Sequence, residues 1–375
     1  MLDLGRQYAA IRDQILAAVE RVFSSQHFIL GAEVEALESE LATFTGTAHA
    51  VGCASGTDAL WLALAAVGVG PGDSVITTPF SFFASASAIV RAGARPVFID
   101  VDPHTLNLDA DRVEAHLRAG KSAQLRVLLP VHLFGQCADM DALLRLAAEF
   151  QLTMVEDAAQ AVGAAWDQRR AGSFGATAAF SFYPSKNLSA YGDAGLITTN
   201  DRDRADHMRR LRNHGSPKRY VHDELGWNSR LDAIQAAVLR VKLPYLESWN
   251  QKRRERAATY DRLLTQSGLI APTADAPVRV LLAQPQAHHI YHQYAIRAHR
   301  RDDVREFLTQ RNIGTEVYYP IPLHLQPVFT YLGYREGDLP EAERAAKEIL
   351  ALPMFPELTE SEQQWVVESI AEFYS

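Results

Sequence analysis

Cysteine is scarce in this sequence. Cys53 and Cys137 are the two cysteines among 375 residues, too few and too far apart for a disulfide framework or a thiolate zinc site. The histidines include no H-E-x-x-H motif either, so a common pattern of catalytic zinc is missing. We therefore expect no metal site, and a reducing compartment such as the cytoplasm.

Basic residues are outnumbered, and long apolar runs are absent. Lys and Arg total 37 against 45 Asp and Glu, which gives a formal net charge of -8, whereas binding nucleic acid or an anionic membrane requires a basic face. No stretch approaches the roughly 18 apolar residues of a membrane span. The first residues, with Asp3 and Arg6, lack the apolar core of a secretory signal. We expect neither nucleic acid nor membrane as a partner.

Apolar residues are abundant and follow a regular pattern. They make up 47% of the chain, enough for a large core. After two predicted helices, at 9–23 and 33–44, short apolar runs alternate with helical patterns, which predicts βαβ units and a mostly parallel sheet flanked by helices. In such sheets the ligand lies beyond the carboxyl ends of the strands. The predicted strands are 48–53, 74–78, 95–101, 126–131 and 152–156, and the helices between them are 57–67, 82–92, 109–118 and 140–150.

The pattern changes in the second half of the chain. Two short strands within 178–199 surround a loop, and a loop rich in Pro and Ala at 271–287 suggests a boundary. We therefore predict a large domain at 1–250 and a smaller C-terminal α+β domain at 251–375. The further predicted helices are 202–213, 231–264, 302–311 and 341–350, and the further strands are 292–298 and 315–318.

A possible phosphate site begins the third predicted helix. The segment Ser55-Gly-Thr-Asp-Ala-Leu60 follows a predicted strand. Gly56 allows close approach of the backbone, and the N–H groups of Thr57 and Asp58 lie at a helix N-terminus, which favours an anion. The same residues also fit an ordinary Ser or Asp helix cap. A P-loop, a dinucleotide fingerprint and a nucleophile elbow are all absent.

A carboxylate and an amide follow the strand at 152–156. Asp157 and Gln160 are three residues apart, so in a turn they lie on one side. A carboxylate there can keep a heteroaromatic nitrogen protonated, and an amide can bond a ring oxygen. An N-cap role for Asp157 explains the pattern equally well.

One lysine lies in a loop of small residues. The chain has six lysines, and Lys186 follows an apolar strand within Ser181-Phe-Tyr-Pro-Ser-Lys-Asn187, whereas the other five lie in segments that look solvated. A lysine becomes a nucleophile when it is desolvated or bound as a Schiff base. Ser181 is placed to bond a phosphate. A surface lysine in a turn is the alternative interpretation.

An aromatic segment follows the strand at 74–78. One of Phe80, Phe82 and Phe83 could cover a flat cofactor, and we expect core packing for at least two of them. A phosphate, a ring with a basic nitrogen and an oxygen, and an aldehyde for a lysine are together the features of pyridoxal 5′-phosphate.

These motifs resemble those of the DegT/DnrJ/EryC1/StrS family of pyridoxal-phosphate-dependent nucleotide-sugar aminotransferases. The resemblance extends over nearly the whole chain. It implies a fold-type I aminotransferase that works as a homodimer with active sites shared between subunits. The matching segments are 28–31, 55–60, 156–160, 181–187, 226–232 and 319–322.

The resemblance also implies roles for single residues. Lys186 would form the Schiff base and move the proton, Asp157 would pair with the pyridine nitrogen, and Gln160 would bond the ring hydroxyl. The residues implied around the phosphate and ring are Gly56, Thr57 and Ser181 for the phosphate, Phe82 for stacking, and Asn228 for the phosphate of the other subunit.

The substrate implied by the resemblance is a nucleotide-linked keto-sugar, with L-glutamate as amino donor. Residues 228–243 are most similar to the branch that aminates C3 of dTDP-linked 3-keto-6-deoxyhexoses, whereas 135–139 resemble enzymes acting on UDP-linked 3-keto uronic sugars. Tyr318 stands where many relatives have histidine. A 4-keto sugar, a dehydratase, in which histidine replaces the lysine, and a cofactor-binding regulator are the alternatives. Candidate sugar or diphosphate contacts are Tyr183, Arg230, Tyr319 and His324.

Overall fold

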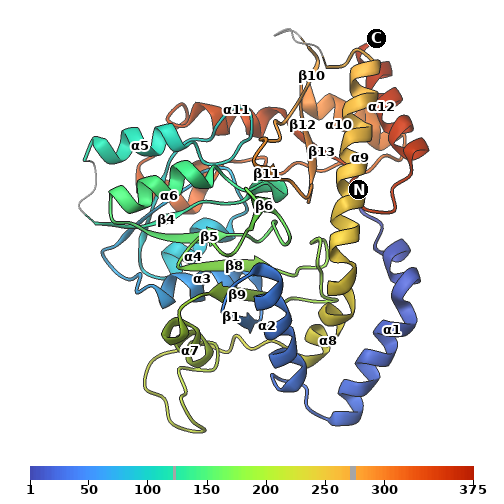
Figure 1. The fold of residues 1–375 in the computed structure, drawn as a ribbon. Coiled ribbons are helices and arrows are strands. Elements are labelled where there is room, and N and C mark those ends of the chain that lie inside the picture. The colour runs from blue at the N-terminus through green and yellow to red at the C-terminus, as the bar shows by residue number, and fades with distance from the viewer. Residues whose placement is uncertain (121–123, 271–275) are drawn as a thin grey trace.

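A computed structural model describes residues 1–120, 124–270 and 276–375. A seven-stranded sheet forms the centre of the large N-terminal part, in the order β1-β9-β8-β5-β4-β2-β3 (Figure 1). Neighbours from β8 to β3 run parallel, whereas β9 is antiparallel to both β1 and β8. The predicted mostly parallel sheet is confirmed. Its strands are β1 His49–Cys53, β2 Ser74–Thr77, β3 Arg95–Phe98, β4 Leu125–Leu129, β5 Thr153–Asp157, β8 Thr177–Ser181 and β9 Gly195–Thr199.

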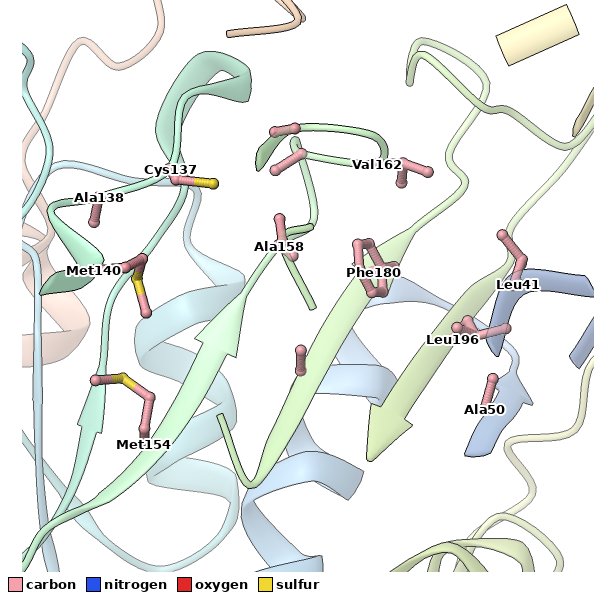
Figure 2. Close-up of a cluster of buried hydrophobic side chains, with 14 of the residues drawn as sticks. Leu41, Ala50, Cys137, Ala138, Met140, Met154, Ala158, Val162, Phe180 and Leu196 are labelled. Atoms are coloured by element: carbon pink, nitrogen blue, oxygen red, sulfur yellow. The ribbon is translucent and has the colours of Figure 1, made fainter. Parts of the chain in front are cut away.

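Helices cover both faces of this sheet. Successive side chains of a strand point to opposite faces, so Met154 joins the core beneath α2, α5 and α6, and Val155 joins the core beneath α3, α4 and α7. Figure 2 shows the first of these cores, where Phe180 and Leu196 from adjacent strands face Leu41 of α2. The helices are α1 Leu4–Ser25, α2 Ala32–Thr45, α3 Gly56–Ala66, α4 Ala84–Arg91, α5 Ala110–Arg118, α6 Met140–Glu149, α7 Arg202–Leu211 and α8 Ala233–Lys242, with a short 3-10 turn η1 at Leu133–Gly135.

A second core lies in the C-terminal part. The long helix α9 runs from the region of the large sheet to a three-stranded antiparallel sheet, β10-β12-β13 (Figure 1). Its first residue, Leu246, belongs to the core of the large sheet, and Tyr260 near its other end belongs to the C-terminal core. The division at residue 250 stays a prediction, since α9 crosses it. These elements are α9 Leu246–Gln266, β10 Val278–Val280, β12 Tyr294–Ala298, α10 Arg301–Gln310, α11 Pro340–Glu348, β13 Ile349–Leu352 and α12 Glu360–Tyr374, with 3-10 turns η3 Leu323–Leu325 and η4 Pro327–Leu332.

A third sheet connects the two parts. Strand β11 (Ala287–His288) pairs with β6 (Ala165–Trp166), which pairs with β7 (Arg169–Arg170). The C-terminal segment is therefore hydrogen-bonded to a hairpin that follows β5. Part of the predicted boundary loop, 271–275, lies outside the described residues, and its remainder contains β10 and β11 instead of being loop throughout.

The single long helix predicted at 231–264 is wrong. Helix α8 is followed by a 3-10 turn, η2 Leu243–Tyr245, before α9 begins. Pro244 lacks the N–H that a continuous helix needs at this position. The break is hard to see in the sequence because the residues before and after Pro244 are both typical of helices.

Two further elements near the C-terminus differ from prediction. The segment 315–318 forms no strand, because only Glu316 bridges to Ala351 before the chain reaches Pro320. The helix predicted at 341–350 ends at Glu348, and the apolar run that follows is the buried strand β13. Among the described residues, no helix is long and apolar enough to cross a membrane.

Candidate active site

A cavity of about 440 Å³ lies where β5 and β8 end and where α3 and α4 begin. This is the carboxyl edge of the parallel strands, where ligands bind in α/β proteins. Nine of the residues singled out from the sequence line it: Gly56, Thr57, Phe82, Asp157, Gln160, Ser181, Tyr183, Lys186 and Tyr319.

Lys186 lies in a turn at the wall of the cavity. Its backbone N–H donates to the carbonyl of Tyr183 at 2.8 Å, and Ala190 N–H donates to Phe182 at 2.8 Å, which closes the loop. Burial lowers the pKa of Lys186 to about 8, and the charge of Asp157 opposes this shift. An amine with such a pKa exchanges protons near neutral pH.

The prediction that all other lysines are solvated is wrong for Lys242. Its side chain is fully buried, and Nζ donates to the carbonyl and hydroxyl of Ser189 at 2.8 and 3.1 Å. It also lies 4.0 Å from the ring centre of Tyr191. Lys242 does not line the cavity. Of the rest, Lys121 falls outside the described residues, and Lys218, Lys252 and Lys347 are exposed.

Asp157 ends β5 as a buried carboxylate. Its Oδ2 accepts a 2.7 Å hydrogen bond from Ser85 Oγ, and its Oδ1 accepts one from Ala159 N–H at 3.2 Å. Burial raises the pKa of Asp157, while these hydrogen bonds and the charge of Lys186 oppose the shift. No helix begins after Asp157, so the N-cap interpretation fails here. The carboxylate is available to a cationic group in the cavity.

The N-terminus of α3 packs tightly against β8. A Cβ built on Gly56 would lie 2.5 Å from Ser181 Cβ, closer than side chains tolerate. Ser55 caps the helix by accepting from Asp58 N–H at 3.1 Å, so the cap interpretation of this motif is confirmed. The cap leaves other N–H groups of the first turn free, and with Ser181 they form a cradle suited to a phosphate.

Gln160 is held by protein groups on both sides. Its Oε1 accepts from the backbone N–H of Phe134 at 2.6 Å, which fixes the orientation of the amide. Its Nε2 therefore donates to the hydroxyl of Tyr319 at 3.0 Å. Burial raises the pKa of Tyr319, so this hydroxyl keeps a proton that it can donate into the cavity.

The expectation that at least two of the three Phe residues pack in the core is wrong, because only Phe80 is fully buried. Phe83 is 40% exposed and stacks on Phe329 with ring centres 5.5 Å apart. Phe82 is 58% exposed and lines the cavity, 6.4 Å from the ring of Tyr319. Only Phe82 of the three is therefore placed to cover a flat ligand.

Three predicted residues lie outside the cavity. Asn228 is exposed, and its backbone bridges to Asn213. Arg230 donates to the side chain of Asn213 at 3.2 Å. His324 is buried, with Nε2 3.1 Å from a carboxylate oxygen of Glu343. Its ring faces the protein interior, which corrects the expectation that His324 contacts substrate.

Sequence reasoning missed several residues of the cavity wall, among them Ser85, His292 and Gln293. Ser85 carried a usable signal, because it lies in the first turn of a helix that follows a strand, as Thr57 does. His292 and Gln293 come from beyond α9, where the local pattern indicates only a strand. Their position depends on how the C-terminal part packs against the large sheet.

Pyridoxal phosphate fits this set of residues. The cavity presents a buried amine of lowered pKa in Lys186 and a buried carboxylate in Asp157. In the same cavity, the absence of a Cβ at Gly56 lets the N-terminus of α3 lie directly against the hydroxyl of Ser181. An aldehyde-binding amine, a partner for a pyridinium nitrogen and a phosphate cradle are the groups that this cofactor requires.

Comparison with known proteins identifies close relatives. A protein named "Pleiotropic regulatory protein" from Geobacillus stearothermophilus is 50% identical over 374 residues, covering 100% of this chain and 98% of the relative. A "UDP-N-acetyl-3-dehydro-alpha-D-glucosamine 3-aminotransferase" from Acidithiobacillus ferrooxidans is 43% identical, covering 96% and 94%. A "dTDP-3-amino-3,4,6-trideoxy-alpha-D-glucose transaminase" from Streptomyces venezuelae is also 43% identical, covering 99% and 95%.

The fold leads to the same group. The crystal structure of S. venezuelae DesV in complex with a ketimine intermediate matches with a TM-score of 0.93 and 42% identity, covering 99% of this chain and 97% of that one. This confirms the fold-type I architecture. The model of the DegT/DnrJ/EryC1/StrS aminotransferase family matches residues 9–371. The chain therefore belongs to the DegT/DnrJ/EryC1/StrS family of pyridoxal-phosphate-dependent aminotransferases.

Proposed function

We propose that the protein transfers an amino group from L-glutamate to carbon 3 of a nucleotide-linked 3-keto sugar, in the biosynthesis of an amino sugar. The observation that carries this proposal is the placement of Lys186 and Asp157 in one cavity beside the phosphate cradle. Two relatives at 43% identity carry names that place their amino group at carbon 3. A dTDP-linked 3-keto-6-deoxyhexose is the substrate that we favour, because residues 228–243 resemble that branch.

The residues divide the chemistry between them. When bound, pyridoxal phosphate supplies an aldehyde that combines with amines and a ring that withdraws electrons. Asp157 holds a proton on the ring nitrogen, where a buried carboxylate acts most strongly. Gly56, Thr57 and Ser181 hold the phosphate, and Phe82 covers the ring. Gln160 Nε2 carries two N–H groups, so one donates to Tyr319 and the other remains for the ring hydroxyl.

Lys186 carries the proton transfers. With a pKa of about 8, about one amine in ten is neutral at pH 7. The neutral amine can take a proton from a substrate carbon and return it to a neighbouring atom, which is general base and then general acid catalysis. Tyr183 and Tyr319 line the same cavity and are our candidates for contacts to the sugar.

A second copy of the chain completes the site in this proposal. Asn228 and Arg230 lie outside the cavity of their own chain. The segment leading to them exposes large apolar side chains, with Leu225 96% and Trp227 46% exposed. Exposed apolar side chains of this size are typical of a contact surface. In the proposed homodimer, Asn228 reaches the phosphate of the partner's cofactor, and Arg230 is available to the partner's sugar.

The alternatives differ in the sugar and in the reaction. The resemblance at 135–139 favours a UDP-linked 3-keto uronic sugar, and a 4-keto sugar is the other alternative. A dehydratase is disfavoured because Lys186 is present. The name of the relative that is 50% identical suggests a regulator. A buried carboxylate and an amine of lowered pKa in one cavity, Asp157 and Lys186, favour a catalyst instead.

A substrate panel tests the proposal. The purified protein, loaded with pyridoxal phosphate and L-glutamate, is given dTDP- and UDP-linked 3-keto and 4-keto sugars, and the products are read by NMR. We expect an amino group at carbon 3 and release of 2-oxoglutarate. Amination at carbon 4 would show that the substrate is a 4-keto sugar, and loss of water without amination would show that the protein is a dehydratase. Binding of cofactor with no turnover on the whole panel would favour the regulator.

A further inference from the structure

A network of buried amides lies directly behind the reactive lysine. Asn187 follows Lys186 in the chain and is 5% exposed. Its Nδ2 donates to Asn250 Oδ1 at 2.7 Å and to the carbonyl of Ile290 at 3.3 Å. Asn250, 1% exposed, donates from its own Nδ2 to the carbonyl of Val162 at 3.2 Å. Carbonyl oxygens only accept, so both amide orientations are fixed.

This network sets the tautomer of a histidine in the cavity wall. With Nδ2 of Asn187 used as donor, its Oδ1 faces Nδ1 of His292 at 3.1 Å. An amide oxygen only accepts, so Nδ1 of His292 carries a proton. Burial, together with the charges of Lys186 and Arg253, lowers the pKa of His292 well below its ordinary value. His292 is therefore a neutral imidazole, and its lone pair is on Nε2.

The lone pair of Nε2 has no strong partner within the described part of the chain. Its neighbour is the amide nitrogen of Gln293 at 3.5 Å, which is long for a hydrogen bond. His292 and Lys186 line the same cavity. An uncharged acceptor thus lies in the wall that also holds a buried amine, and a buried ammonium needs such acceptors.

We propose that His292 is a positioning residue for the reaction, which accepts a hydrogen bond from the amine of Lys186 at Nε2 and so orients that amine. Asn187 and Asn250 act behind it by keeping the proton on Nδ1. The arrangement gives Lys186 an acceptor that, unlike Asp157, has no charge. This proposal for His292 rests on the function proposed above for Lys186.

Two variants of His292 separate this role from simple packing. In His292→Asn, the short amide still reaches Oδ1 of Asn187 but has no atom at the place of Nε2. In His292→Gln, the longer side chain carries an acceptor to the place of Nε2 and gives up the contact with Asn187. The control is His289→Asn, because His289 is a nearby neutral histidine, with a pKa lowered to about 3 by burial, that does not line the cavity.

The deciding measurement uses the cofactor-free protein. The pKa of the Lys186 amine is obtained from the pH dependence of its acetylation rate, followed by peptide mass spectrometry. A hydrogen bond to an ammonium favours the charged form, so we expect the pKa of Lys186 to fall by about one pH unit in His292→Asn. It should stay within about 0.3 of the parent value in His292→Gln and in the control.

Turnover with glutamate gives the second measurement. We expect kcat to fall about tenfold in His292→Asn with little change in KM, because the variant loses the orientation of the Lys186 amine and no contact that binds substrate. An unchanged pKa of Lys186 in His292→Asn overturns the proposal, as does a larger shift in His292→Gln than in His292→Asn. If His292→Asn does not fold, His292→Ala takes its place: a lowered pKa of Lys186 that is retained in His292→Gln supports the role of Nε2, and an unchanged pKa in His292→Ala overturns it. Failure of the proposed function would appear differently, as the absence of cofactor attachment to Lys186 in the parent protein.

Discussion

The hydroxyl of Ser85 donates a 2.7 Å hydrogen bond to Oδ2 of Asp157, although the two residues are 72 positions apart in the chain. Ser85 belongs to the first turn of α4, and Asp157 ends β5. The contact opposes the rise in the pKa of Asp157 that burial causes. Ser85 thus helps to keep this carboxylate ionised.

We expect Ser85→Ala to lower turnover about tenfold, the size of one hydrogen bond to a charged group. Asp157→Ala should lower turnover much further while changing the melting temperature little, because a buried carboxylate contributes little to stability. Ser87→Ala is the control, since Ser87 lies in the same helix and bonds only a backbone carbonyl. Steady-state kinetics measure the turnover of each variant, and thermal unfolding measures its melting temperature. Equal losses in Ser85→Ala and Ser87→Ala would count against this role of Ser85.

Borohydride reduction should attach the cofactor to Lys186. The labelled peptide must be identified, because Lys242 is also buried with a pKa of about 8, although it lies away from the cavity. We expect the label on the peptide with Lys186 and none on the peptide with Lys242. Lys186→Ala should abolish the label and lower turnover about a thousandfold or more. A label that persists in Lys186→Ala refutes the assignment.

A methyl group at residue 56 should weaken cofactor binding. The Cβ of Gly56→Ala would lie 2.5 Å from Ser181 Cβ, so helix or strand must shift at the cradle. We expect the dissociation constant for pyridoxal phosphate to rise about ten- to a hundredfold. Gly70→Ala is the matched control, because a Cβ there meets no atom within 4 Å. Titration of the cofactor-free proteins, followed by tryptophan fluorescence, measures both. If Gly56→Ala binds the cofactor as tightly as the parent protein does, the phosphate does not bind at the N-terminus of α3.

Mixed dimers test the shared site. Asn228→Ala and Lys186→Ala should each be nearly inactive alone. If Asn228 serves the partner's cofactor, a mixed dimer contains one site with neither change, and we expect about half of the parent turnover per such dimer. Differently tagged chains purified together allow this measurement. Activity no higher than that of the separate variants would argue against a contribution from Asn228 across the interface.

Lys242 should give the folded protein a measurable dependence on pH. Its pKa is lowered to about 8 by burial, from 10.5 in an exposed lysine. Below about pH 8 it is charged in both states, and its burial costs stability. Between pH 8 and about 10.5 only the unfolded chain holds the proton, so rising pH favours the folded state.

Against Lys242→Met, the cofactor-free parent should therefore gain up to about 3 kcal/mol in the free energy of unfolding over this pH range. Lys252→Met, in an exposed position of α9, is the control and should show no such difference. Urea unfolding at a series of pH values is the measurement. A constant difference between parent and Lys242→Met across the range would show that Lys242 is not titrating there.

Much of the site was predictable because it depends on local patterns. Gly56, Asp157 and Ser181 each lie where a strand of the parallel sheet ends or a helix begins, and strand ends are visible as the limits of apolar runs. Since the carboxyl ends of parallel strands share one edge, these residues had to lie close together. The helices and strands from 48 to 156 follow for the same reason.

The remainder depends on contacts between distant segments. Lys242 looked solvated because a charged residue in a helix usually faces water, and only the packing of α8 on the loop around Ser189 buries it. His324 looked available because nothing nearby indicates Glu343 as its partner. His292 reaches the cavity only through the docking of the C-terminal part. Local sequence patterns do not predict contacts between such distant segments.

The loop of Lys186 is tied by its next residue, Asn187, to α9 through Asn250 and to the backbone of Ile290. A chain cut at residue 250 would keep the reactive amine and the carboxylate but lose the anchorage at Ile290. The N-terminal part is therefore not a self-sufficient catalytic module. Chimaeras that exchange C-terminal parts between relatives, in order to change the sugar, should keep these amide partners on both sides of the junction.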